Sequence, residues 1–223
     1  MMAKRFICAV IFLLCVMSVF PQEFATGGVF DPELYAQVPL RATTRDVTQL
    51  PPSASLKAYS PFPREQGRYG SCTAWATAYA ARTISESVRM RRQDRTLTTN
   101  NAFSPLFVYR TISDDPTGER GIHIYHALDL MKDPGIPRRI MSETERLFET
   151  PLSDFALSRR YLIQDYARLF EKQWSTERGW HSVDPSIKIR PIKRALAEGR
   201  PVVINMYTPS SFHRVRSTEP WIP

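Results

Sequence analysis

One glutamine and one cysteine have the types and the spacing that acyl-transfer chemistry needs. Gln66 and Cys72 lie at the two ends of the segment QGRYGSC. The apolar residues after Cys72 recur at helical steps of three and four, so we expect Cys72 in the first turn of a helix. Free N–H groups and the positive end of the helix dipole favour a thiolate there, and the thiolate is the nucleophilic form of cysteine. The position therefore favours a reactive thiol over a buried, inert one.

Attack by a thiolate on a carbonyl carbon also needs hydrogen-bond donors for the oxyanion that forms. The backbone N–H of Cys72 and the side-chain amide of Gln66 can both donate to it. A neutral amide suits this role because it has no charge to desolvate. Gly70 has no side chain, so the backbone of a substrate can approach the sulfur closely. The remaining requirement is a general base, which is normally a histidine oriented by an Asn or Asp.

The chain has four histidines, and none has a sequence context typical of a catalytic base. His123 and His126 are one helical turn apart, which indicates a polar pair rather than a metal pair, since the sequence offers no third ligand nearby. His181 is expected in a surface loop. His213 comes late in the chain, but charged residues follow it in place of the apolar strand that would position an imidazole. We therefore predict no metal site, and the sequence does not assign the base.

The first residues of the chain have the pattern of a signal peptide. Lys4 and Arg5 precede an apolar run over residues 6–20, and this order is typical of the charged and hydrophobic parts of such a segment. The run is shorter than the roughly 20 apolar residues that a membrane span needs. We expect residues 1–25 to be removed, and the mature protein to be secreted or periplasmic with no stable membrane span.

Removal of that segment would leave a single thiol. Cys8 and Cys15 lie inside it, so Cys72 is the only cysteine of the expected mature chain and no internal disulfide can form. The whole chain has a formal net charge of +8 and carries several arginine clusters. A solvated basic surface explains them, because no aromatic-interleaved basic stripe or nucleic-acid motif accompanies them. We expect no nucleic-acid partner.

Away from Cys72, the sequence predicts helices early in the chain and one core strand late. Helices are expected from Ser71, from Ser104, over 122–131 and from Pro191, with an extended segment at 187–189 and a buried strand at 201–207. A single strand cannot satisfy the hydrogen-bonding groups on its own edges. Either earlier extended segments pair with it, or the rest of a sheet is missing from this sequence.

The segment from Gln66 to Cys72 resembles the active-site signature of the papain family of cysteine peptidases. Further segments resemble that family in the same order, at 50–59, 104–109, 121–128 and 192–203. The resemblance implies an α+β, papain-like two-lobe fold, in which a helical lobe and the start of a β-barrel lobe flank a cleft. It also implies hydrolysis of peptide bonds through a Cys72 acyl-enzyme, by a monomer that needs no cofactor.

The same resemblance implies a role for each matching residue. Cys72 is the implied nucleophile, and Gln66 is the implied oxyanion donor. The residues implied to bind substrate are Gly70, Ser71, Gly121 and Ile122. The expected partner is therefore a peptide or protein substrate.

The resemblance divides the chain into three segments. At two positions near Cys72 the sequence departs from the family pattern. We expect the signal peptide at 1–25, an N-terminal arm at 26–49 and the peptidase domain at 50–223. Thr73 stands where the family usually has tryptophan, and Tyr69 stands where many members have a disulfide cysteine.

The histidine and asparagine that complete the papain-type site should follow a region like 207–223, and the sequence ends there. We therefore expect a domain truncated before these residues and inactive as written. A non-catalytic peptide- or partner-binding protein on the same scaffold is the main alternative. A transglutaminase-like Cys-His acyl transferase is disfavoured by the spacing between the glutamine and the cysteine.

Overall fold

The computed structural model describes residues 27–42, 49–140, 143, 148–171, 173–175, 179–181 and 184–206. The expected signal peptide and His213 lie outside these residues. The described elements, in chain order, are β1 (Gly28–Val29), α2 (Pro32–Gln37), η1 (Lys57–Tyr59), α3 (Cys72–Ala74), η2 (Trp75–Arg82), α4 (Thr83–Arg89), α5 (Arg95–Asn100), α6 (Pro105–Ile112), β2 (Ile122–His123), α7 (Ile124–Lys132), η3 (Leu152–Phe155), β3 (Gln173–Ser175), β4 (Gly179–His181) and α8 (Pro185–Ala197). The chain therefore combines helices with short strands, as expected for the α+β class.

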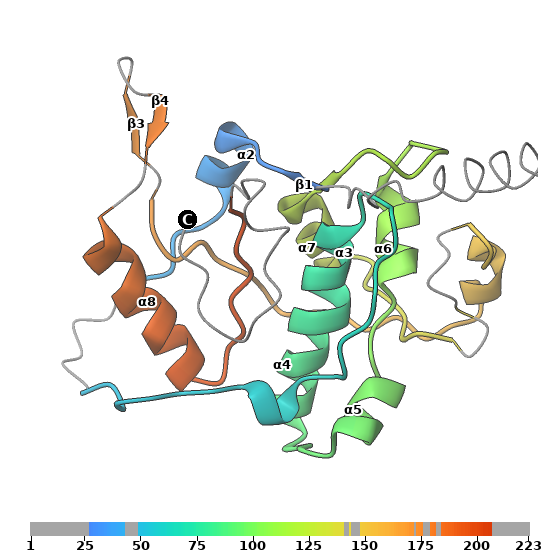
Figure 1. Cartoon of the computed structure of the whole chain (residues 1–223), viewed down its shortest axis with the longest axis horizontal. Helices are drawn as coiled ribbons and strands as arrows, with labels where there is room; N and C mark the ends of the chain where they lie inside the picture. The colour runs from blue at the N-terminus through green and yellow to red at the C-terminus, as the bar shows by residue number, and fades with distance from the viewer. Residues whose placement is uncertain are drawn as a thin grey trace, which may run out of the picture.

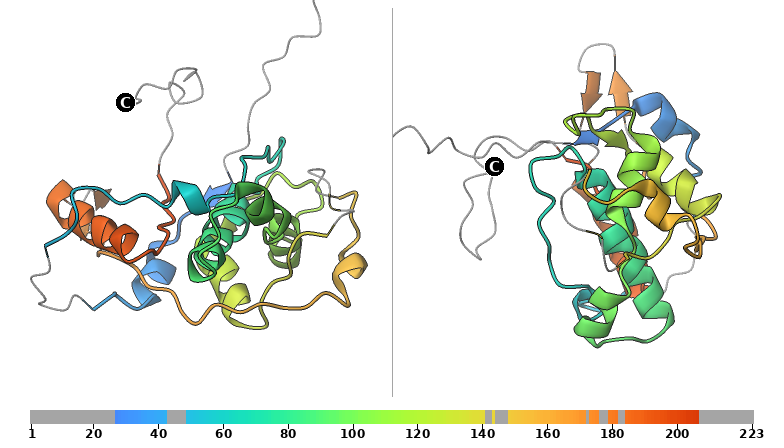
Figure 2. Two further views of the ribbon diagram at one scale, coloured as in Figure 1. Left: turned by 90° about the horizontal axis from the view of Figure 1, so that it is seen from below. Right: turned by 90° about the vertical axis from the view of Figure 1, so that its right-hand side faces the viewer.

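Four of the helices pack together. Figures 1 and 2 show α3, α4, α6 and α7 side by side, whereas α8 lies apart from them, on the other side of the molecule. The two strand pairs are short. β1 pairs in parallel with β2, and β3 pairs antiparallel with β4. None of the described helices is long and apolar enough to cross a membrane.

The central helix begins at Cys72 and continues through α3, η2 and α4 to Arg89. This confirms the helix expected from Ser71. Its middle part, η2, is a π-helix, which has more residues per turn than an α-helix and so rotates the face that follows it. As a result Ile84 and Val88, two of the apolar residues that recur at helical steps after Cys72, are only half-buried. Polar residues of α4 are buried in their place, among them Thr83, Glu86 and Ser87.

The apolar core lies between this helix and α6 and α7. Its buried members are Ala74, Ala78, Phe103, Leu106, Phe107, Val108, Tyr109, Ile122, Ala127, Met131, Ile136 and Phe155. The start of α6 is as the sequence predicts, because Pro105 occupies the first turn and the Ser104 hydroxyl accepts a hydrogen bond from the Phe107 N–H at 2.9 Å. This capped helix supplies four core side chains that pack behind α3.

A buried carboxyl group stabilises the same helix start. The Ser104 hydroxyl donates to Oε1 of Glu143 at 2.9 Å, and Arg139 lies 3.6 Å from that oxygen. Burial raises the pKa of Glu143, and the opposing effects of Arg139 and of the hydrogen bonds do not offset it. The short distance to the positively charged Arg139 would by itself predict a lowered pKa for Glu143. Burial prevails because only 1% of the Glu143 side chain is exposed.

We expect Glu143→Gln to change how stability depends on pH. A raised pKa means that the fold favours the neutral carboxyl, so this stabilisation is complete below the unfolded pKa of about 4.3 and is lost as pH rises through the folded pKa. The free energy of unfolding of the wild type should therefore fall relative to Glu143→Gln above about pH 4.3, by on the order of 1 kcal/mol per unit of pKa shift. Urea denaturation between pH 4 and 8 measures this. Glu33→Gln, at an exposed position in α2, is the control, and parallel curves for wild type and Glu143→Gln would contradict the prediction.

The structure corrects three expectations in the last third of the chain. α8 begins at Pro185, with Asp184 as its cap, and Pro191 lies inside it, so the helix does not start at Pro191. Residues 187–189 are helical, not extended, because a capped proline start overrides their short alternating pattern. No strand is present over residues 201–206, the described part of the expected strand 201–207, and Ile204 is 65% exposed. A strand needs a partner for its backbone groups, and the described residues provide none at this segment.

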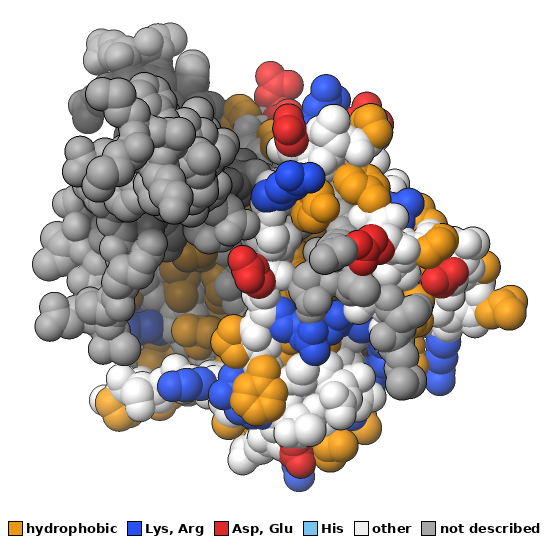
Figure 3. Space-filling model, turned by 45° about the vertical axis from the view of Figure 1, so that its right-hand side comes forward, with side chains coloured by type: hydrophobic (Ala, Val, Ile, Leu, Met, Phe, Trp, Pro, Cys, Tyr) orange, Lys and Arg blue, Asp and Glu red, His pale blue; other side chains and the backbone are white. Residues whose placement is uncertain are grey.

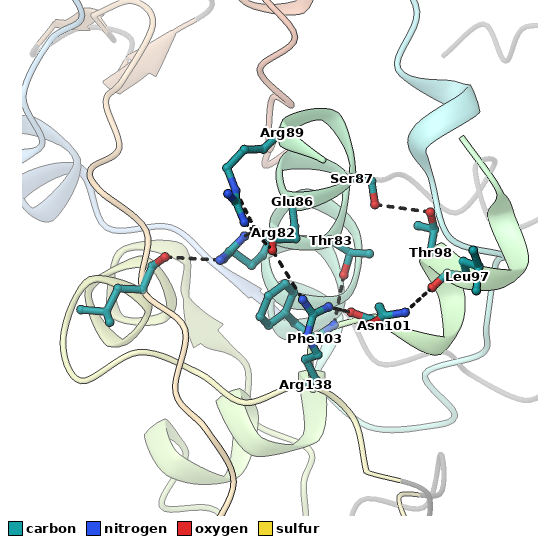
Figure 4. Close-up of polar contacts among 11 residues, drawn as sticks. Arg82, Thr83, Glu86, Ser87, Arg89, Leu97, Thr98, Asn101, Phe103 and Arg138 are labelled. Atoms are coloured by element: carbon teal, nitrogen blue, oxygen red, sulfur yellow. Dashed lines mark hydrogen bonds and ion pairs between the residues drawn. The ribbon is translucent and has the colours of Figure 1, made fainter. Parts of the chain in front are cut away.

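A network of three arginines surrounds the buried Glu86 side chain beside the core (Figure 4), and of these Arg82 is itself buried whereas Arg89 is exposed. Arg82 and Arg89 contact the Glu86 carboxylate at 3.2 and 2.9 Å, and Arg138 contacts it at 3.4 Å. The Arg82 guanidinium also lies over the Phe103 ring, 4.3 Å from its centre. The network connects the central helix to the segment after α7. On the face shown in Figure 3, Lys and Arg side chains are interspersed with acidic, apolar and other polar ones.

Candidate active site at Cys72

Cys72 is the first residue of α3, and its thiol is free and half-buried. The Ser71 side chain makes no capping hydrogen bond. The first helical bond into this turn is from the Trp75 N–H to the Ser71 carbonyl, at 3.1 Å. The N–H groups of the first turn, including that of Cys72, therefore have no carbonyl partner within the helix. The sulfur is attached at the end of a helix where negative charge is favoured.

The Gln66 side chain is fixed by the loop that leads into α3. Its Nε2 donates a hydrogen bond to the Tyr69 carbonyl at 2.9 Å. A primary amide has two N–H donors, so this bond orients the amide and leaves one donor for another acceptor. The turn itself depends on Gly67, whose φ of 69° favours glycine. The structure thus places an oriented amide in the same short loop as the cysteine.

Gly70 brings this loop against the segment that precedes β2. Its N–H donates to the Gly118 carbonyl at 2.7 Å. A methyl group added at Gly70 would lie 2.6 Å from the Glu119 carbonyl oxygen, which is closer than real contacts allow. Only glycine therefore permits this approach. It sets the distance between the cysteine loop and Gly121, the next residue implied to bind substrate.

The Asp115 side chain stabilises the loop that carries Gly118. It accepts hydrogen bonds from the N–H groups of Arg120 and Thr117, at 2.7 and 2.9 Å, and from the Thr117 hydroxyl. These bonds stabilise the carboxylate and lower the pKa of Asp115 to about 2. The loop keeps this arrangement at any pH at which the carboxylate is ionised.

The residues implied to bind substrate divide into two groups. Gly70 and Gly121 lie on either side of Gly27, whose backbone approaches both of them closely, and we call the space between them the groove. The side chains of Ser71 and Ile122 are buried, at 2% and 4% exposure, and Ile122 belongs to the apolar core. Any contribution of these two residues to a ligand must therefore come from their backbone.

An extended segment of the chain itself occupies this groove. Gly28 and Val29 of β1 lie in register with Ile122 and His123 of β2. Figure 1 shows β1 beside the first turn of α3 and the start of α7.

Gly27, which precedes β1, lies between the backbone at Gly70 and the backbone at Gly121. A methyl group added at Gly27 would lie 1.8 Å from the Gly70 carbonyl oxygen, and one added at Gly121 would lie 2.2 Å from the Gly27 carbonyl oxygen. The Thr73 hydroxyl also donates to the Gly27 carbonyl, at 3.3 Å. We call residues 27–29 the groove segment.

The sequence pattern does not predict this arrangement. Residues 26–49 are expected only to form an arm, and Thr73 has no expected role beyond its departure from the family pattern. The adjacent pair Gly27-Gly28 was the available signal, because two glycines permit a close backbone approach. Their partners lie far away in the sequence, so the signal alone could not locate the contact.

The described histidines do not supply an assigned base. The rings of His123 and His126 meet edge to face with their centres 5.2 Å apart. Nδ1 of His123 is buried and has no hydrogen-bond partner among the residues that the structure describes. No group of three or more His, Cys, Asp or Glu side chains in the described part of the chain could bind a metal ion.

A pocket of about 380 Å³ lies on the outer side of the cysteine loop. Its lining residues are Arg68, Tyr69, Pro116, Thr117, Glu119 and Phe148. Tyr69 and Phe148 meet edge to face at 5.9 Å, and Arg68 lies over the Tyr69 ring. Tyr69, at the position of a disulfide cysteine in many papain-type enzymes, therefore forms an aromatic wall here. The pocket lining therefore combines aromatic rings with charged side chains.

Comparison with known proteins adds no relative. No protein-family model matches the chain, and no curated protein is significantly similar to it. Any assignment of function must therefore come from the residues around Cys72.

Proposed function

We propose that this chain is a secreted or periplasmic cysteine peptidase domain of the papain-like, two-lobe type, with Cys72 as its nucleophile and Gln66 as an oxyanion donor. One observation carries the proposal most directly: an extended backbone segment packs against Gly70 and Thr73, which flank the free Cys72 in the sequence. A peptidase must bind its substrate in this extended form, with the scissile carbonyl close to the nucleophile.

The proposed reaction divides peptide hydrolysis into two acyl transfers. The Cys72 thiolate attacks the carbonyl carbon, a C–S bond forms, and the oxyanion accepts hydrogen bonds from the Cys72 N–H and the Gln66 amide. The C–N bond then breaks, and the amine leaves with a proton from a general acid. Water attacks the thioester and releases the thiol and the carboxylic acid. A general acid–base group must complete the site, and the described residues do not identify it.

Hydrolysis of short peptides by the exported protein tests this proposal. A fluorogenic peptide library supplied at millimolar concentration should be cleaved, and iodoacetamide should abolish cleavage in step with the mass increase of the peptide that contains Cys72. Turnover that persists after complete alkylation of Cys72 would refute the proposal. Peptide binding without any turnover would favour a non-catalytic binding protein, for which the backbone pairing between β1 and β2 already provides the contact.

We expect Gln66→Ala to lower kcat by about 10²–10³-fold with a smaller effect on KM, because an oxyanion donor acts mainly in the transition state. Steady-state kinetics on one peptide substrate measure this. Gln93→Ala is the matched control, since Gln93 is an exposed glutamine whose amide donates to the Tyr59 hydroxyl. Equal kcat for the wild type and Gln66→Ala would remove Gln66 from the mechanism.

A further inference from the structure

We infer that the groove beside Cys72 is selective for glycine at the position between Gly70 and Gly121, and that its resident ligand is the groove segment of the same chain. The inference names the class of peptide that the groove accepts, and in calling that peptide a substrate it rests on the proposed function. The contacts that carry it do not depend on turnover.

The first step is the width of the groove at Gly27. Backbone lies on both sides of this residue, at Gly70 and at Gly121, and a methyl group at Gly27 would come within 1.8 Å of a backbone oxygen. Backbone cannot rotate away as the end of a flexible side chain can. The neighbouring Gly28 differs, because a methyl group there would meet only the end of the Asn205 side chain, at 3.3 Å. Selectivity is therefore confined to one position.

The second step is that the backbone on both sides of Gly27 is held in place by specific contacts. Gly70 itself cannot carry a side chain, because of the Glu119 carbonyl, and its N–H is bonded to Gly118. The groove segment also makes specific contacts with the rest of the chain. The Thr73 hydroxyl donates to the Gly27 carbonyl, and the next two residues lie in register with β2. A segment with a glycine followed by an extended dipeptide matches all of these contacts.

The third step concerns competition. A ligand tethered to its own site has an effective concentration in the millimolar range, so a free peptide at micromolar concentration cannot displace it. The groove segment should therefore block binding of micromolar peptide in the wild type, whereas millimolar peptide can compete with it. Overpacking by one methyl group against backbone should weaken it by about tenfold or more.

The test measures binding of two fluorescent peptides, acetyl-GGVFD and acetyl-AGVFD, by anisotropy. The first has the sequence of residues 27–31, and the second carries alanine at the first position. The proteins are Gly27→Ala and the matched control Gly28→Ala, both in the Cys72→Ala background so that no peptide is consumed. We expect Gly27→Ala to bind acetyl-GGVFD at least about tenfold more tightly than acetyl-AGVFD. Gly28→Ala should bind neither peptide at micromolar concentration.

Equal binding of the two peptides, or equal behaviour of the two variants, would overturn the inference. Should Gly27→Ala fail to fold, the chain with only Cys72→Ala is titrated with both peptides at millimolar concentration, where acetyl-GGVFD must still bind the more tightly. Selective binding with no hydrolysis by the chain that retains Cys72 would refute the proposed function and leave the inference standing. Hydrolysis of both peptides with equal efficiency would refute the inference and leave the proposed function standing.

Discussion

Replacing Cys72 with alanine should lower kcat/KM for peptide hydrolysis by at least about 10⁴-fold. The variant loses the sulfur that forms the acyl-enzyme, and no other residue of the cysteine loop offers a comparable nucleophile. Gln66 and the helix N-terminus would remain and could still bind the substrate. We therefore expect the loss in kcat, with KM changed far less. Steady-state kinetics at several enzyme concentrations measure both parameters.

The fold should tolerate this change, which makes the result interpretable. The Cys72 thiol is half-buried at the start of a helix, and alanine is a good residue in a helical first turn. Its free energy of unfolding should therefore stay within about 1 kcal/mol of the wild-type value. Cys72→Ser adds a second comparison, because the hydroxyl preserves shape but is a far weaker nucleophile. Full activity in either variant would exclude Cys72 from the chemistry.

The helices around the site follow from local sequence rules. Ser104 and Pro105 predict the start of α6, and the structure has the hydrogen bond that this motif needs. The helix that begins at Cys72 was predicted from its apolar steps. The π-helix within it was not, since its register depends on packing against α6 and α7. That change of register explains why the buried face of α4 carries polar residues that a periodic apolar pattern cannot identify.

The groove and the last third of the chain depend on contacts between distant residues. Gly27 meets Gly70 and Gly121, and neither local propensity nor spacing relates these three positions. Similarly, an apolar run such as 201–206 is compatible with a strand, but a strand forms only where a partner presents its backbone. The candidate site was therefore predictable at the cysteine loop, where the chemistry is local, and not in the wall that faces it.

Replacing Glu86 with alanine should lower the free energy of unfolding by about 3–5 kcal/mol, because it leaves the buried Arg82 guanidinium without its carboxylate. The Arg82 and Glu86 side chains are each 8% exposed, so water cannot replace the lost partner. Arg82 would retain its hydrogen bond to the Leu162 carbonyl at 3.3 Å and its contact with the Phe103 ring. Neither provides a compensating negative charge. Such a loss is a large part of the 5–15 kcal/mol typical of a folded domain, and urea denaturation at pH 7 measures it.

A double variant separates the ion pair from simple loss of packing. Arg82→Met with Glu86→Leu removes both charges and keeps much of the buried volume, so it should be more stable than Glu86→Ala alone.

Burial raises the pKa of Glu86, but hydrogen bonds from Arg89 and Arg82 outweigh it, so the pKa lies below its usual value. A lowered pKa gives stabilisation that is present above the unfolded pKa of about 4.3 and is lost as pH falls through the folded pKa. The double variant should therefore lose less stability than the wild type as pH falls below about 4.3, whereas Glu143→Gln alters the dependence above that pH. An unfolding free energy of Glu86→Ala within 1 kcal/mol of the wild type would show that the arginines find other partners, and the Glu86 network would then have no structural role of the proposed size.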